Sequence, residues 1–240
     1  FDFYDWIGGA VKTEKDATVV WFVGAKRDDK GVIVADPTSL FAFPVAGQQR
    51  EGTFLFNASG VNLWFTFGPV PLQRFDLRGT FDDKGEVKPD SQFMAQAVCA
   101  DIPSYGSQMP ATGMCDTQGV LTAAGTFLGE QAESPAVRRV PGMKIGDVTY
   151  TPGSPATVST TIDAPAGYTS DDHFVSILLI GDDGLPVPID YYSSTKIETD
   201  ESKQITGVTV TVDAPLPANF RAVVMTDAFP AKTQDLGGGS

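Results

Sequence analysis

The sequence contains a single histidine, His173, among 240 residues. Imidazole is the usual general base near neutral pH and a common ligand of zinc, copper and haem iron. A chain with one histidine can therefore form few catalytic or metal sites of these kinds. A Ser-His-Asp hydrolase would have to use His173 with Asp171 or Asp172, its neighbours in sequence, and adjacency does not orient an imidazole. The chain also has no G-x-S-x-G nucleophile elbow. We therefore expect no histidine-based triad, no metal and no cofactor.

Positive charge is also scarce, with 17 Lys and Arg against 30 Asp and Glu, a net charge of −13. Residues 1–141 carry 12 bases and 17 acids (−5), and the remaining residues carry 5 bases and 13 acids (−8). Both parts repel phosphate backbones and anionic lipid, so a nucleic-acid partner is not expected. An acidic surface instead attracts basic partners or keeps the protein soluble.

No run of 18 apolar residues occurs, so we expect no membrane span. The chain begins at Phe1 without a charged-then-apolar leader, as a processed or trimmed chain does. Residues 237–240 (GGGS) have the composition of a flexible linker.

Only two cysteines are present, Cys99 and Cys115, and they bracket a segment rich in Pro, Gly and Ser. A disulfide closing such a loop would stabilise the fold by about 3 kcal/mol in the chain-entropy model. This pairing predicts an extracellular, periplasmic or cell-surface protein. The alternative is two unpaired thiols in a cytosolic protein, because spacing alone does not establish a bridge.

Residues 129–146 (GEQAESPAVRRVPGMKIG) have no sustained period of 2 or 3.6 and are punctuated by Pro and Gly. We interpret this segment as a connection between domains. The sequence therefore predicts an N-terminal domain over residues 1–135, a second domain over 142–232, and a tail or linker remnant over 233–240.

The N-terminal part is predicted to be all-β, either an antiparallel sandwich or a barrel. Short β-branched and aromatic runs predict its strands, and the opening FDFYDWIGGAVKTEKD could be an edge strand or a packed arm. Asp and Gly recur together after Arg27, after Phe81 and after Gly181, which predicts tight turns. The expected strands cover residues 17–25, 53–58, 61–68, 74–81, 92–99 and 119–127.

Residues 142–232 show turn signals every 8 to 12 residues between about seven short β-like runs, which is typical of a Greek-key sandwich. Six of these runs are DVTYT, ATVSTTIDA, HFVSILLIG, VPIDYYSS, ITGVTVTVD and FRAVVMTDAFP. We predict an immunoglobulin-like or fibronectin-III-like domain. The similarity is one of architecture only, because the Cys-Trp-Cys hallmark of antibody domains is missing.

Exposed aromatics flanked by hydroxyl and amide groups on a β face can stack on sugar rings and bind their hydroxyls. In VNLWFTF, Trp64 shares a strand face with Asn62 and Thr66, and Tyr191-Tyr192 offers a second aromatic pair. These five residues are the candidate ligand-binding residues. The alternative for Trp64 is that its ring packs beneath a loop or the other domain.

The sequence favours a non-enzymatic secreted or cell-surface protein that acts as a structural, adhesion or binding module, with a protein or glycan partner. The first alternative is a carbohydrate-binding protein or an accessory module of a glycan-active enzyme. The second is a hydrolase, since a glycosidase needs only two carboxylates and the chain has 30. Neither the ligand nor the oligomeric state follows from the sequence.

Overall fold

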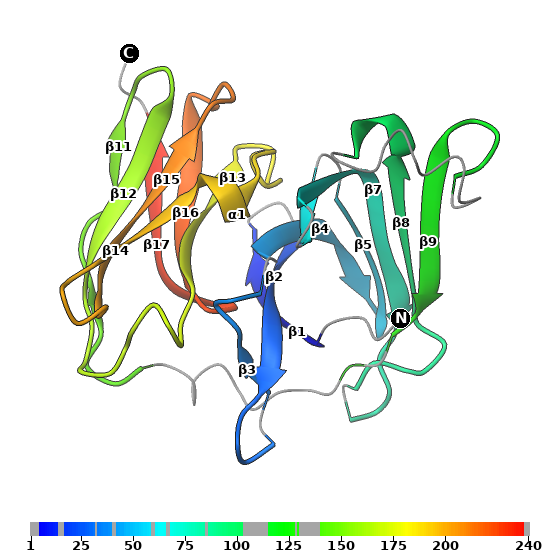
Figure 1. Ribbon diagram of the computed structural model, residues 1–240, viewed down its shortest axis with the longest axis horizontal. Helices are drawn as coiled ribbons and strands as arrows, with labels where there is room; N and C mark the ends of the chain where they lie inside the picture. Colours follow the sequence, from blue (N-terminus) through cyan, green and yellow to red (C-terminus); the bar gives the residue numbers. More distant parts are fainter. Residues whose placement is uncertain are drawn as a thin grey trace. The chain divides into compact units, whose positions relative to one another are not determined.

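The computed structural model describes residues 5–13, 17–31, 33–39, 42–58, 61–65, 68–84, 86–102, 115–127, 129 and 140–237 (Figure 1). Nearly all of its regular structure is β, and the strands pair antiparallel, which confirms the all-β prediction. None of the helices in these ranges is long and apolar enough to cross a membrane.

The chain divides into two compact units. Unit 1 combines Phe1–Pro44 with Ser134–Ser240, and unit 2 is Val45–Glu133. The later division lies inside the segment 129–146 that the sequence marked as a connection. The earlier division, within a strand, has no signal in the sequence, and it groups the first 44 residues with the C-terminal part. Independent folding of residues 1–135 and 142–232 stays a prediction.

Unit 1 begins with the hairpin β1 (Asp5–Lys12) and β2 (Thr18–Arg27), and the short β3 (Ile33–Ala35) pairs with the end of β2. Over Asp5–Lys12 the opening segment is therefore a paired strand rather than an arm. The strand continues through Gly8-Gly9. Gly9 packs directly against the backbone at Ala228. A Cβ at Gly9 would lie 1.7 Å from the carbonyl oxygen of Ala228, so only glycine fits there.

Trp21 on β2 joins this hairpin to the C-terminal part of unit 1. Its indole is 0% exposed and meets the ring of Tyr191 edge-on, with centroids 5.4 Å apart. Its Nε1 donates to the carbonyl oxygen of Asp227 at 3.1 Å. A large aromatic that is buried and hydrogen-bonded in this way makes the N-terminal hairpin part of the core of unit 1.

Residues 140–237 contribute two further sheets to unit 1, which form a sandwich-like pair of layers on the left of Figure 1. The first has the order β10-β12-β15-β14 with β11 added on β12, and the second has the order β13-β16-β17. Their strands alternate buried and exposed residues where one face meets water, whereas β13 is buried along nearly its whole length. The strands are β10 (Lys144–Ile145), β11 (Thr149–Thr151), β12 (Ala156–Asp163), β13 (Val175–Gly181), β14 (Thr195–Thr199), β15 (Ile205–Val212), β16 (Asn219–Thr226) and β17 (Phe229–Gly237).

Three details of this region differ from the sequence prediction. The VPIDYYSS run contains no strand; Asp190 caps a single helical turn, α1 (Tyr191–Ser194), by accepting from the Ser193 N–H at 3.3 Å. The strand comes after it, as β14. The FRAVVMTDAFP run is two strands, because Asp227 takes a left-handed φ of 53° and turns the chain between β16 and β17. Residues 233–237, assigned to a tail, complete β17 opposite β16.

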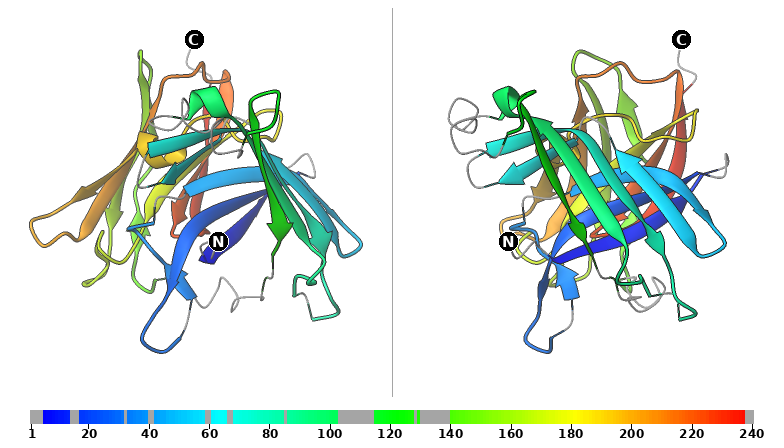
Figure 2. Two further views of the ribbon diagram at one scale, coloured as in Figure 1. Left: turned by 45° about the vertical axis from the view of Figure 1, so that its right-hand side comes forward. Right: turned by 90° about the vertical axis from the view of Figure 1, so that its right-hand side faces the viewer.

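Unit 2 is built on an antiparallel sheet with the order β4-β5-β7-β8-β9, and β6 pairs with β7. Figure 2 (right) shows β5, β7, β8 and β9 side by side. One face is apolar and buried, with Phe54, Phe56, Phe75 and Leu77 at its centre. The elements are β4 (Ala42–Arg50, whose first three residues belong to unit 1), β5 (Thr53–Ala58), β6 (Val61–Phe65), β7 (Gly68–Thr80), β8 (Gln92–Val98), the 3₁₀ turn η1 (Cys99–Asp101) and β9 (Val120–Thr126).

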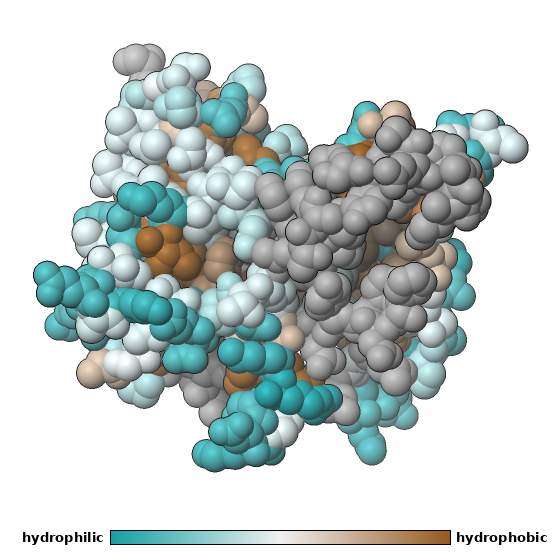
Figure 3. Space-filling view, viewed as in Figure 1, coloured by the Kyte–Doolittle hydropathy of each residue, from teal (hydrophilic) through white to brown (hydrophobic). Residues whose placement is uncertain are grey.

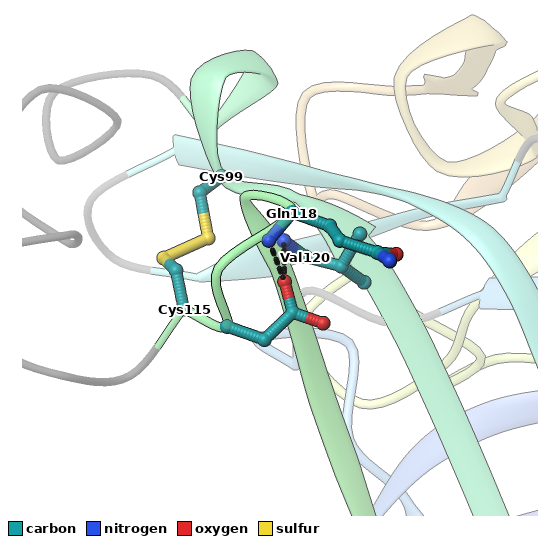
Figure 4. Close-up of a disulfide and its surroundings, with 5 residues drawn as sticks. Cys99, Cys115, Gln118 and Val120 are labelled. Atoms are coloured by element: carbon teal, nitrogen blue, oxygen red, sulfur yellow. Dashed lines mark hydrogen bonds between the residues drawn. A yellow bond between two sulfur atoms is a disulfide. The ribbon is translucent and has the colours of Figure 1, made fainter.

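The predicted disulfide between Cys99 and Cys115 is confirmed (Figure 4). It ties η1, at the end of β8, to the turn that starts β9. Asp116 shapes that turn: its Oδ1 accepts from the backbone N–H groups of Gln118 and Val120 at 2.8 and 2.9 Å. The bridge therefore fixes the ends of two neighbouring strands.

Reducing this disulfide is expected to lower the free energy of unfolding of unit 2 by about 3 kcal/mol, since it closes a 16-residue separation. Urea denaturation of the full chain with and without dithiothreitol measures the change. The variant carrying both Cys99→Ser and Cys115→Ser is the control, because dithiothreitol should leave its curve unchanged. Identical curves for the oxidised and reduced native chain would contradict the prediction.

Candidate functional site: the polar face of unit 2

The two predicted tyrosines lie in different environments. Tyr191 is 1% exposed, and its hydroxyl donates to the carbonyl oxygen of Val187 and accepts from the N–H of Leu179, each at 3.1 Å. Burial raises the pKa of the Tyr191 hydroxyl. Its ring is thus a core element with no face open to a ligand. Tyr192 is half-buried, and burial followed by the charge of Asp190 raises its pKa.

The other predicted row lies on β6 and its end. Asn62 is half-buried on β6, opposite Pro71 of β7. The backbone of Trp64 pairs with Pro69. The Trp64 side chain and the whole of Thr66 lie outside the described residues. A stacking role for Trp64 stays a prediction.

His173 has a partner that sequence adjacency did not indicate. Its Nδ1 lies 3.1 Å from Oδ2 of Asp227, not beside Asp171 or Asp172, and its ring stacks on that of Tyr168 with centroids 4.0 Å apart. Burial, and secondly the charge of Asp227, raise the pKa of the Tyr168 hydroxyl. Among the described residues no serine or threonine hydroxyl bonds to the imidazole, so this pair orients the ring without completing a triad.

Potential metal ligands do not gather elsewhere in the described ranges: no group of three or more His, Cys, Asp or Glu side chains converges there. Unit 1 does have a shallow hollow of about 380 Å³ over β12 and β15, lined by threonine and serine hydroxyls with Asp147 and Glu198. Both carboxylates already pair with lysines, Asp147 with Lys232 and Glu198 with Lys196, each at 2.9 Å. Figure 3 shows mainly hydrophilic and intermediate colours over these strands.

The polar face of unit 2 is the side of the β4–β9 sheet opposite the buried phenylalanines. Side chains on a strand alternate between the two faces, so the neighbours of Phe54, Phe56, Phe75 and Leu77 must point the other way. These neighbours are mostly exposed and carry amide, hydroxyl or guanidinium groups. The polar face consists of Gln48, Arg50, Thr53, Leu55, Asn57, Arg74, Asp76, Arg78, Thr80, Gln92, Met94, Gln96, Thr122, Ala124 and Thr126.

The strand register aligns these side chains in rows across the sheet. The longest row crosses five strands, and at about 4.8 Å between strands it spans about 19 Å. Two shorter rows lie on one side of it, and Arg50, Thr53 and Thr80 lie on the other. The long row is Gln48, Leu55, Arg78, Gln92 and Thr126; beside it lie Asn57, Asp76, Met94 and Ala124, and then Arg74, Gln96 and Thr122.

Hydrogen bonds hold several of these groups in place. Arg78 donates from Nε to Oε1 of Gln92 at 3.1 Å, and its Nη2 donates to the same oxygen. Arg74 forms an ion pair with Asp76 two residues along the strand. Gln96 donates to the Thr122 hydroxyl at 3.4 Å. The polar face is therefore a grid of hydrogen-bond donors and acceptors in which several side chains hold one another in place.

The apolar residues of the polar face are few. Leu55, 54% exposed, lies at its centre next to Arg78, and Met94 lies one row away. No residue of the polar face is aromatic. The sequence does hold a signal for this site, since Arg74, Asp76 and Arg78 alternate with Phe75 and Leu77. The prediction from exposed aromatics did not include these amides and arginines.

A scan against protein-family models and a search of curated proteins find no match for this chain. The site therefore has to be interpreted from its own residues.

Proposed function

We propose that this chain is a non-enzymatic binding module that works outside the cytosol, and that the polar face of unit 2 binds a glycan. The observation that carries the proposal is the grid of exposed amides, hydroxyls and guanidinium groups on an open sheet. Sugar hydroxyls each donate and accept hydrogen bonds, so a flat array of such groups can bind several at once.

A glycan fits this face better than a folded protein does. The centre of a protein interface is usually rich in Tyr, Trp and Phe and depleted of charge. The polar face instead has arginine and glutamine beside Leu55, and no aromatic ring. A protein partner would find no aromatic anchor on it.

The disulfide supports the proposed cellular location. The Cys99–Cys115 bridge favours an extracellular, periplasmic or cell-surface protein, because such bonds persist in oxidising compartments.

We also propose that residues 140–237 are an immunoglobulin-like module. The strand orders β10-β12-β15-β14 and β13-β16-β17 support this, since they correspond to the ABED and CFG sheets of constant-type domains.

Exposing the full chain to an array of neutral and acidic glycans tests the proposal. We expect retention of at least one glycan, and we expect the variant carrying both Gln92→Ala and Gln96→Ala to lose about tenfold in affinity, about 0.5–1.5 kcal/mol for each hydrogen bond removed. Gln118→Ala, an exposed amide in the turn before β9, is the matched control and should bind normally. Binding that the double variant leaves unchanged would place the site elsewhere.

A further inference from the structure

The arginines of unit 2 are all on one surface. Unit 2 contains Arg50, Arg74 and Arg78, and each lies on the polar face, whereas its lysines, Lys84 and Lys88, lie in the connection between β7 and β8. Asp76 is the only acid on that face. The remaining acids of unit 2 within the described ranges lie in turns, connections or η1. A chain of net charge −13 thus presents one sheet face with excess positive charge.

On this basis, and resting on the proposed function, we infer that the polar face binds a carboxylated polysaccharide of the polyuronate type. Among the described residues Arg50 makes no ion pair and Arg78 bonds only to a neutral amide, so two of the three guanidinium groups have no carboxylate partner within that part of the chain. Charge complementarity therefore selects an anionic glycan over a neutral one.

The geometry at Arg78 favours a carboxylate in particular. Its Nε and Nη2, the two donors that grip planar carboxylates, both point at one oxygen of Gln92. A carboxylate can take that place, because its two oxygens accept both donors as a bidentate ion pair, whereas the Gln92 amide offers one neutral oxygen. The Gln92 amide is then released and can bond a neighbouring sugar hydroxyl. In the free protein, the hydrogen bonds to Gln92 already hold the Arg78 guanidinium in place. This order reduces the side-chain entropy lost on binding.

The polar face also lacks the groups that a neutral polysaccharide would need. Stacking on aromatic rings supplies much of the contact energy with uncharged sugars, and this face has no such ring. Affinity must come from ion pairs and hydrogen bonds, with Leu55 and Met94 offering only small apolar contacts. The binding should therefore weaken steeply as salt is added.

Binding of the full chain to polygalacturonate, compared with the fully methyl-esterified polymer, tests this inference. Esterification keeps the sugar backbone and removes the charge. We expect the esterified polymer to bind about 10- to 100-fold more weakly, the range for losing hydrogen bonds to charged groups. Arg78→Gln and Arg50→Gln should each weaken binding of the acidic polymer by a similar factor. Arg78→Lys, which keeps the charge but not the fork, should behave like Arg78→Gln.

Arg27→Gln is the charge-matched control, since Arg27 is an exposed arginine at the end of β2 in unit 1 and should not affect binding. Thermal melts of every variant establish that it is folded. Equal binding of the charged and esterified polymers overturns the carboxylate inference and leaves the glycan proposal standing. Acidic binding that survives both Arg50→Gln and Arg78→Gln also overturns it. Failure of the native chain to bind any glycan refutes the proposed function and this inference together.

Discussion

Trp21→Ala is expected to lower the free energy of unfolding of unit 1 by about 3–5 kcal/mol, the range for removing a buried tryptophan. The indole is fully buried, so its loss leaves a cavity beside Tyr191. It also removes the donor to the Asp227 carbonyl. Because Trp21 is on the N-terminal hairpin and Tyr191 is on α1, the effect should appear in the transition that unfolds residues 140–237.

Urea denaturation of the full chain, followed by circular dichroism, measures this change. Trp6→Ala is the matched control, because Trp6 is on the same hairpin but is only partly buried, against Phe22 and Phe43. Its expected cost is smaller, about 1–2 kcal/mol. A cost for Trp21→Ala as small as the one expected for Trp6→Ala would mean that the hairpin does not contribute to the core through Trp21.

Asp227→Ala is expected to cost unit 1 about 2–4 kcal/mol, because the carboxylate has two partly buried partners and the residue has a left-handed backbone conformation. Its Oδ1 accepts from the N–H of Phe174 at 2.9 Å and its Oδ2 lies 3.1 Å from Nδ1 of His173. Its backbone carbonyl, which alanine retains, accepts from Trp21 and does not contribute to this cost. Its left-handed φ of 53° suits Asp or Asn better than alanine.

Three substitutions at position 227 separate these contributions. Asp227→Asn keeps the left-handed preference and a side-chain acceptor, so it should cost clearly less than Asp227→Ala. Asp227→Gly relieves the backbone strain but still removes the carboxylate, so it should fall between them. Equal melting temperatures for all three variants and the native chain would show that the side chain has no structural role.

Several strands could be predicted because each carries its own signal, whereas β4 (Ala42–Arg50) lay outside the expected ranges. The TFLFNA run became β5 with the expected bounds, and the alternation of Phe54 and Phe56 with exposed neighbours shows why the period was readable. The Asp-Gly turn after β2 also follows local chemistry: Asp28 Oδ1 accepts from the Lys30 N–H and Gly31 takes a positive φ.

What the sequence did not indicate depends on distant residues. Trp21 and Asp227 are 206 positions apart, and no local pattern predicts that a β2 indole donates to that turn. Likewise Asp190 and Tyr191 open a helical turn where the β-prone YY pair predicted a strand, since a capping bond and burial outweigh local propensity. The register of β7 with β8 was needed to place Arg78 beside Gln92, and the register of five strands to recognise the long row of the polar face.

The most direct test of glycan binding by the polar face is an amide-resolved NMR titration of the full chain with a galacturonic acid oligosaccharide. We predict that the largest chemical-shift changes occur at residues of the polar face, foremost Leu55, Arg78 and Gln92, and that they diminish when sodium chloride is added. The amides of residues 140–237 should change little. Changes confined to residues 140–237, or none anywhere at saturating oligosaccharide, would contradict it.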